Sequence, residues 1–204
     1  CNQYLELLFG KDGHASKGKG TNAGELTDDA VIRPTERVEW RVGLAYENRM
    51  NYSPSEYRWG DKCAGIVDFV ISQGSSLYPV ILKSNADITF KFRVKYSQDI
   101  IRPIFGFAVK TKDGVTIYNT NTEIQDVPVI DFARAGQEMD IEVVMPVQLY
   151  QGDYFVSVGI ASCDASGNVV PHDRRYDSIH ITIEPTTDFI GLVDLGAKIS
   201  CDAK

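Results

Sequence analysis

Few residues of this chain have a spacing that could support catalysis. Residues 13–20 read Gly-His-Ala-Ser-Lys-Gly-Lys-Gly, which matches a phosphate-binding loop as far as its lysine. Such a loop needs Ser or Thr directly after the lysine to bind Mg²⁺, and it lies between a strand and a helix. Gly20 stands at that position, within a polar stretch. We therefore do not expect these residues to bind a nucleotide.

The three histidines, His14, His172 and His180, lie in no metal-binding or nucleophile pattern. A metal cluster of His172 with Asp173 and Asp177 is conceivable, but strand alternation would point these side chains in different directions. A hydrogen-bonded surface network is the preferred interpretation of this segment.

Serine and carboxylate chemistry is also weakly supported. Ser157 and Ser162 lack the setting of a nucleophile elbow. Paired carboxylates for glycoside hydrolysis stay open, because the spatial separation of Asp and Glu side chains is not readable from sequence. We expect no catalytic residue, no metal and no cofactor, with a glycan-cleaving enzyme as a lower-ranked alternative.

Composition limits the possible partners. The chain has 204 residues, 43% apolar and 24% charged, enough for one buried core and an appendage. Its net charge of −7 and pI near 5.0 argue against nucleic acid or an anionic membrane as the main partner, since both require a broad basic field.

The four cysteines, Cys1, Cys63, Cys163 and Cys201, lie far apart and show no paired zinc-site spacing. We expect free thiols in a reducing compartment. A disulfide is the alternative, and it would require secretion.

The first 50 residues differ in composition from the rest. Residues 2–9 have near-helical apolar spacing, but they are too short to span a bilayer and lack the order of a signal peptide, so cytoplasm is expected. Residues 11–29 are almost without apolar side chains, which predicts a flexible linker. Residues 33–50 predict at most a short helix beginning at Pro34.

From Asn51 onward the pattern is that of short strands. In residues 87–96, apolar and polar side chains alternate strictly, giving one buried and one wet face. Further strands are predicted at 64–72, 79–83, 104–111, 115–118, 139–147, 154–162, 178–184 and 189–199. Turns at 113–114 and 164–168 close hairpins. Strands without intervening helices predict an all-β fold, a two-sheet antiparallel β-sandwich or jelly roll, over residues 51–204.

The outward side chains of three strands suggest a binding face. They are Lys91, Arg93 and Lys95 in the first strand, Phe155, Ser157, Gly159 and Ala161 in the second, and Ser178, His180, Thr182 and Glu184 in the third. If these strands share a sheet, a basic stripe lies beside a floor of small side chains, a surface suited to a sugar chain. An ordinary solvated face is the alternative.

An ordered series of motifs carries a family resemblance. The series comprises Ser55–Gly60, Ala64, Asp68, Pro103–Phe107, Asp113–Thr122, Leu149–Tyr154, Asp173–Asp177 and Gly191–Leu195. Together these motifs resemble the C-terminal domain of Wzt, the nucleotide-binding subunit of bacterial ABC exporters for O-antigen polysaccharide. The likeness runs from about Asn51 to the end. One departure is Asn119, where the family commonly has Gly before Thr-Asn-Thr.

The resemblance implies a cytoplasmic jelly-roll domain that recognises the finished, often terminally modified, end of an O-antigen polysaccharide. It also implies that residues 1–9 are the last helix of an ATPase domain and that residues 11–29 are a tether. The ATPase motifs are absent from the 204 residues, so ATP hydrolysis is not expected of them. The implied partners are the polysaccharide, the membrane-spanning exporter subunit reached through the parent ATPase domain, and a second copy of the chain.

The favoured hypothesis is a non-catalytic carbohydrate-binding domain. Its first candidate contacts are Lys91, Arg93, Ser157 and His180, and its second are Arg174, Arg175 and Tyr118. Arginine forks serve carboxylates of either protein or glycan, so Arg174 and Arg175 fit a structural ion-pair and turn unit equally well. The alternatives are a dimerisation module of the transporter and the glycan-cleaving enzyme.

Overall fold

The computed structural model describes residues 46–127, 130–185 and 189–202 of the chain. The helix predicted at residues 2–9, the linker at 11–29 and the helical segment from Pro34 to residue 45 lie outside the described residues.

The described residues contain one short 3-10 turn and twelve strands, joined by turns and loops. They are η1 (Tyr46–Asn48), β1 (Tyr57–Trp59), β2 (Ala64–Gln73), β3 (Ser76–Leu77), β4 (Ile81–Leu82), β5 (Asp87–Tyr96), β6 (Ile100–Ile101), β7 (Ile104–Thr111), β8 (Thr116–Asn121), β9 (Phe132–Ala133), β10 (Glu138–Pro146), β11 (Gly152–Cys163) and β12 (Val169–Ile183). Within these ranges, no helix has the length and apolar content needed to cross a membrane.

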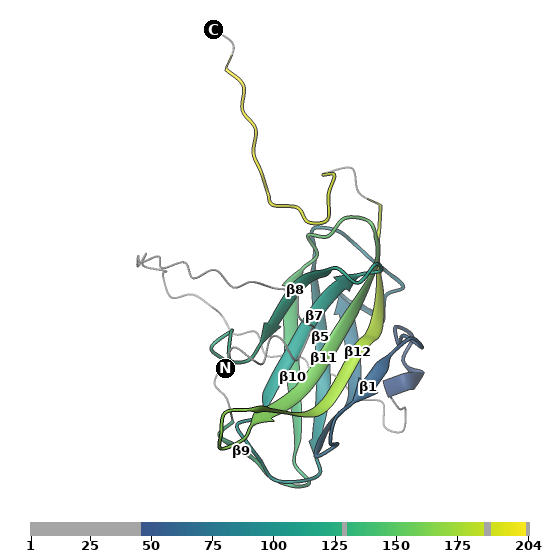
Figure 1. Ribbon diagram of the computed structural model, residues 1–204. Coiled ribbons are helices and arrows are strands. Elements are labelled where there is room, and N and C mark those ends of the chain that lie inside the picture. The colour runs from purple at the N-terminus through teal and green to yellow at the C-terminus, as the bar shows by residue number, and fades with distance from the viewer. Residues whose placement is uncertain (1–45, 128–129, 186–188, 203–204) are drawn as a thin grey trace.

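Two sheets face each other across one core (Figure 1). Sheet A has the order β1-β12-β11-β7-β8, with β4 added parallel to β12. Sheet B has the order β10-β5-β2-β3. The short strands β6 and β9 pair separately. The antiparallel pairing within the two layers confirms the predicted β-sandwich.

The core is built from the inward side chains of both sheets. In β5, Ile88, Phe90, Phe92, Val94 and Tyr96 are fully buried, as their alternation with polar residues predicts. Phe90 and Phe92 pack against Phe107 of β7, with ring centroids 5.3 and 6.4 Å apart. Each such phenylalanine contributes roughly 1.5–3 kcal/mol through burial, so these contacts attract the two sheets to each other.

The structure changes several predicted strand boundaries. The prediction of a strand at 189–199 was wrong: the described part, residues 189–202, forms only a single bridge between Leu149 and Val193, and its end extends away from the sandwich (Figure 1). Gly191 and Gly196 have positive φ angles there, which interrupts an extended ladder. Conversely, β12 begins nine residues before the predicted 178 because its polar first half is paired with β1 and β11.

The loop between β1 and β2 approaches β12 closely. Gly60 has φ +136°, and a Cβ added there would lie 2.4 Å from the carbonyl oxygen of His172. The neighbouring Lys62 amide donates to the same oxygen at 2.9 Å. Only glycine fits at position 60 without displacing β12.

We expect Gly60→Ala to lower the free energy of unfolding by roughly 3 kcal/mol, since a backbone clash adds to the strain of the positive φ. Gly74→Ala is the matched control. Gly74 also has positive φ, at +58°, but nothing lies within 4 Å of its added Cβ, so it should lose about 1 kcal/mol. Urea unfolding of the two variants measures both values. Equal losses would contradict the close approach.

Candidate functional site

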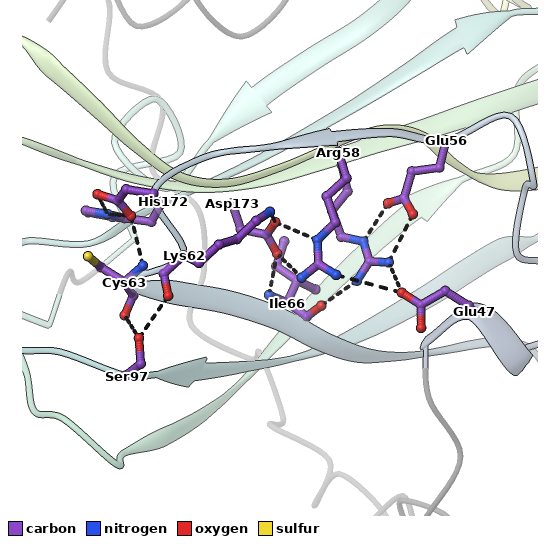
Figure 2. Close-up of polar contacts among 11 residues, drawn as sticks. Glu47, Glu56, Arg58, Lys62, Cys63, Ile66, Ser97, His172 and Asp173 are labelled. Atoms are coloured by element: carbon purple, nitrogen blue, oxygen red, sulfur yellow. Dashed lines mark hydrogen bonds and ion pairs between the residues drawn. The ribbon is translucent and has the colours of Figure 1, made fainter.

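One edge of the sandwich, formed by β1, β12 and β2, is closed by charged side chains (Figure 2). We call Glu47, Glu56, Arg58, Lys62, Asp173 and Arg175 the ionic clasp. Asp173 accepts hydrogen bonds from the Ile66 amide at 2.9 Å, from Arg58 at 2.8 and 2.9 Å, and from Lys62 Nζ at 2.9 Å. One buried carboxylate of sheet A thus binds the backbone of sheet B.

Arg175 completes the connection two residues along β12. Its guanidinium donates to the Ile66 carbonyl at 2.7 Å, to Glu56 at 2.6 and 3.1 Å, and to Glu47 at 2.7 Å. β2 is otherwise an edge strand at Ile66, because β3 pairs with it only at Ser72 and Gln73. Side chains of β12 therefore take the place of a neighbouring strand and satisfy its free N–H and C=O groups.

Three charged side chains at the centre of the ionic clasp are removed from water, whereas Glu47, Arg58 and Lys62 around them are partly exposed. The side chains of Asp173, Arg175 and Glu56 are 0%, 1% and 5% exposed. Burial alone would raise the pKa of Asp173, but hydrogen bonds from Arg58, the Ile66 amide and Lys62 outweigh it and hold that pKa below its ordinary value. These residues are committed to structure, so Arg175 is not available to a ligand.

The outer face of sheet A has a floor of small side chains. Register places Gly159 beside Gly106 and Ser157 beside Ala108, on β11 and β7. The Arg174 side chain passes over Gly159, since a Cβ added there would be 3.0 Å from Arg174 Cδ and 3.2 Å from its Nη1. Ser157 is 1% exposed and exchanges hydrogen bonds with Asp177. Ser157 and Arg174 are thus buried parts of this face.

Two pairs of stacked rings lie on the same face. Tyr57 of β1 and Tyr176 of β12 have ring centroids 6.2 Å apart and planes 10° from parallel. Phe155 and His180 are 5.1 Å apart at 25°. Tyr57 is 65% exposed. The sequence predicted His180 as an outward residue, but it missed Tyr57 because a three-residue strand shows too little alternation to be recognised.

The predicted basic stripe does not adjoin this floor. Lys91 and Arg93 lie on β5 in sheet B, whereas Ser157 and His180 lie in sheet A. The predicted binding face required all three strands to share one sheet, and this condition is not met, because β11 and β12 share sheet A and β5 belongs to sheet B. The stripe is also neutralised by acidic side chains of β10, with Lys91 3.0 Å from Glu142 and Arg93 2.8 Å from Asp140. Cross-strand pairing of opposite charges explains this arrangement.

Tyr118 lies in a groove at the opposite edge of the sandwich. The groove runs between β8 and β10, the last strands of their sheets, and encloses about 530 Å³. Its walls are mainly apolar and include Phe107, Ile117 and Val143. Gln125 donates to the Tyr118 hydroxyl at 3.2 Å and forms the polar part of its rim. Tyr118 is consequently remote from the clasped edge.

One group of potential metal ligands occurs within the described residues. It consists of Asp61, Cys63 and His172. His172 is not grouped with Asp173, whose carboxylate belongs to the ionic clasp. The expected network around His172 is present, but the residue is buried rather than at the surface.

Comparison with known proteins gives one strong match. The family model described as the Wzt C-terminal domain matches residues 55–195. A crystal structure of the C-terminal domain of Wzt is 32% identical, with a TM-score of 0.72 over 77% of this chain and 95% of that chain.

Other matches are more distant. A Niemann-Pick type C2 protein from Japanese carpenter ant is 11% identical, with a TM-score of 0.44 over 63% of this chain and 98% of that chain. A CARDB domain from Pyrococcus furiosus is 12% identical, with a TM-score of 0.32 over 58% of this chain and 94% of that chain. Likeness of this degree supports no statement about function. No match was found among curated proteins.

The fold and its clasped edge define a two-sheet antiparallel β-sandwich domain. The chain belongs to the Wzt C-terminal domain family, since the family model covers more than half of it and a solved member shares the fold at 32% identity. This membership confirms the resemblance seen in the sequence. It supports a non-catalytic domain of an ABC exporter.

The ionic clasp makes a prediction about stability. We expect Arg175→Ala to lower the free energy of unfolding by about 3–5 kcal/mol, because it leaves the buried carboxylate of Glu56 without its cationic partner. The matched control is Arg93→Ala, which removes an equally bidentate but half-exposed pair with Asp140 and should cost less than about 1 kcal/mol. Denaturant unfolding at neutral pH measures both. Similar costs for the two variants would contradict the importance of the clasp.

Proposed function

We propose that this domain binds the end of an O-antigen polysaccharide on the outer face of sheet A and thereby matches cargo to an ABC exporter. The observation that carries the proposal is the presence of two ring stacks, Tyr57 with Tyr176 and Phe155 with His180, beside a floor of small side chains. Family membership supports the transporter role, and the resemblance of the motifs to Wzt suggests the ligand class.

The chemistry of this face suits a sugar. A pyranose ring has a C–H face that packs on aromatic rings and a rim of hydroxyl groups that need donors and acceptors. Tyr57 supplies a reachable ring, and His180 is a half-exposed imidazole hydrogen-bonded to Asp153 at 2.9 Å. Lys110 lies 5.4 Å from the centre of the Tyr176 ring and 3.6 Å from Asp177, so it helps to position that ring.

The seven candidate residues divide among different places under this proposal. His180 is a direct contact, together with the newly recognised Tyr57 and Tyr176. Ser157 and Arg174 shape the floor. Lys91 and Arg93 lie on sheet B. Arg175 belongs to the ionic clasp, and Tyr118 lies in the groove between β8 and β10.

The same proposal assigns the domain to the cytoplasmic side of the inner membrane. There the ATPase domain of the parent subunit would connect it to the membrane-spanning exporter subunit. The acidic composition supports a role without nucleic acid, because no broad basic field is available to bind one.

Calorimetric titration with the O polysaccharide exported by the host strain tests the proposal. Tyr57→Ala and His180→Ala should each weaken binding at least about tenfold, the equivalent of about 1.4 kcal/mol for a lost stacking or hydrogen-bonding contact. The matched control is the double variant Lys91→Ala with Arg93→Ala, on the opposite sheet, which should bind as the wild type does.

Two results would contradict the proposal. Absence of binding by the wild-type domain would contradict the proposed function as a whole. Loss of binding in the Lys91 and Arg93 variant, with normal binding by the Tyr57 and His180 variants, would move the site to sheet B.

We also infer that the domain forms a homodimer through its C-terminal segment. Ile190, Leu195 and Ile199 are 95%, 90% and 93% exposed, on a stretch that leaves the sandwich (Figure 1). Large apolar side chains gathered on one exposed segment are characteristic of an interaction surface. An exporter with two such subunits would provide a second copy as the partner.

Sedimentation analysis tests the dimer. The wild-type chain should sediment as a dimer, and Leu195→Asp combined with Ile199→Asp should shift it to monomers because a carboxylate is costly to bury in an apolar interface. Val80→Asp, a change at a 68% exposed apolar residue elsewhere, should leave the dimer intact. A monomeric wild type, or a dimer unaffected by the two tail substitutions, would contradict the inference.

A further inference from the structure

Three side chains with different donor atoms meet where the β1–β2 loop joins β2. They are Asp61, Cys63 and His172, and their carboxylate oxygen, thiol sulfur and imidazole nitrogen all lie within 4.8 Å of one another. Figure 2 shows Cys63 and His172 beside the ionic clasp. Asp61 and Cys63 come from the loop that leads into sheet B, and His172 comes from β12 of sheet A.

The backbone holds this arrangement in place. Lys62 has φ +66°, an uncommon conformation for a residue with a side chain, and its Nζ binds Asp173, away from the cluster. The loop is fixed to β12 by the Lys62 amide, which donates to the His172 carbonyl at 2.9 Å. Ser97 donates to the carbonyls of Lys62 and Cys63 at 2.8 and 2.9 Å. These bonds hold the backbone that carries the three potential ligand atoms in place before any cation binds.

The orientation of His172 is set by a second hydrogen bond. Its Nδ1 lies 2.9 Å from the Asp61 carboxylate, and its Nε2 lies 2.9 Å from the Ser162 hydroxyl. A hydroxyl can donate or accept, so Ser162 accommodates either imidazole tautomer. If Nδ1 bound a cation, the ring proton would stand on Nε2 and be donated to Ser162 Oγ. Such a partner behind a ligating histidine is typical of metal sites.

Cys63 is not set up as a nucleophile. Burial, followed by the hydrogen bond to Asp61 and its negative charge, raises the pKa of the Cys63 thiol. A protonated thiol is a poor nucleophile. A bound divalent cation favours the thiolate, which is the form that ligates metals, and would release the thiol proton to solvent.

We propose that Asp61, Cys63 and His172 bind a zinc-class divalent cation. Thiolate, imidazole and carboxylate are the ligand types that Zn²⁺ uses, whereas Mg²⁺ and Ca²⁺ prefer oxygen alone. Ligand atoms around tetrahedral Zn²⁺ are roughly 3.3–3.8 Å apart. The three ligand atoms lie within 4.8 Å of one another, and the hydrogen-bonded His172 Nδ1 and Asp61 oxygen, 2.9 Å apart, would separate slightly on binding. Half-exposed Asp61 leaves room for water as the fourth ligand.

The position of this site gives it a structural role. A cation held there would link the start of β2 to β12, directly beside the bonds that Asp173 makes to Lys62 and Ile66. Zinc would then stabilise the same edge that the ionic clasp closes, by binding the folded state and not the unfolded one.

Titration of the chelator-treated full chain with Co²⁺ under reducing conditions tests the site. We expect one equivalent to produce a thiolate-to-cobalt charge-transfer band that Zn²⁺ abolishes, and zinc to raise the melting temperature. Cys63→Ser should remove the band, and Asp61→Asn should weaken binding at least about tenfold. The Asn variant keeps the shape of a half-exposed side chain, so the chain should stay folded and its binding measurable.

Cys163→Ser and Cys201→Ser are the matched controls, and both should keep the band and its stoichiometry. The proposal is overturned if the wild type gives no saturable band. It is also overturned if the band persists in Cys63→Ser, or if it is lost in either control variant instead.

Discussion

The sandwich depends on two oppositely charged side chains of one strand that bind one residue of the facing sheet. Asp173 accepts from the N–H of Ile66, and Arg175 donates to its C=O. A buried charge is costly unless it is paired and hydrogen-bonded, so each needs further partners. Arg58 and Lys62 supply them for Asp173, and Glu56 does so for Arg175. The close packing of the β1–β2 loop against β12, including Gly60, follows from that requirement.

The two long edges of the sandwich are consequently different. At the clasped edge, charges hold the sheets together and leave little space. At the other edge, the acidic side chains of β10 pair with β5 of their own sheet, no ion pair among the described residues links β10 to β8, and an apolar groove opens between these two strands. The broad face of sheet A lies between these edges, and its strands present the aromatic side chains proposed to bind a glycan.

The sequence was sufficient to predict the strands of the core but not the charged first half of β12. β5 was predicted with its observed bounds because five buried side chains alternate with polar ones. Residues 172–177 look like a turn, since polarity alone does not reveal that Asp173 is neutralised by Arg58, 115 positions earlier. Likewise, outward orientation was read correctly for Arg93 and His180, but the assignment of their strands to opposite sheets depends on the order of pairing. His172 meets Asp61 across 111 positions, a proximity that only the fold creates.

Alternation along β12 also places the residues that stabilise the fold and the residues of the outer surface on opposite sides of the strand. Asp173 and Arg175 face the interior and bear on whether the domain folds, whereas Tyr176 and His180 face outward, on the other side of the same strand. A change at an outward position leaves the inward bonds intact, so the outer surface of sheet A is free to diverge while the scaffold is retained. One strand thus permits a lineage to acquire new surface specificities without rebuilding its fold.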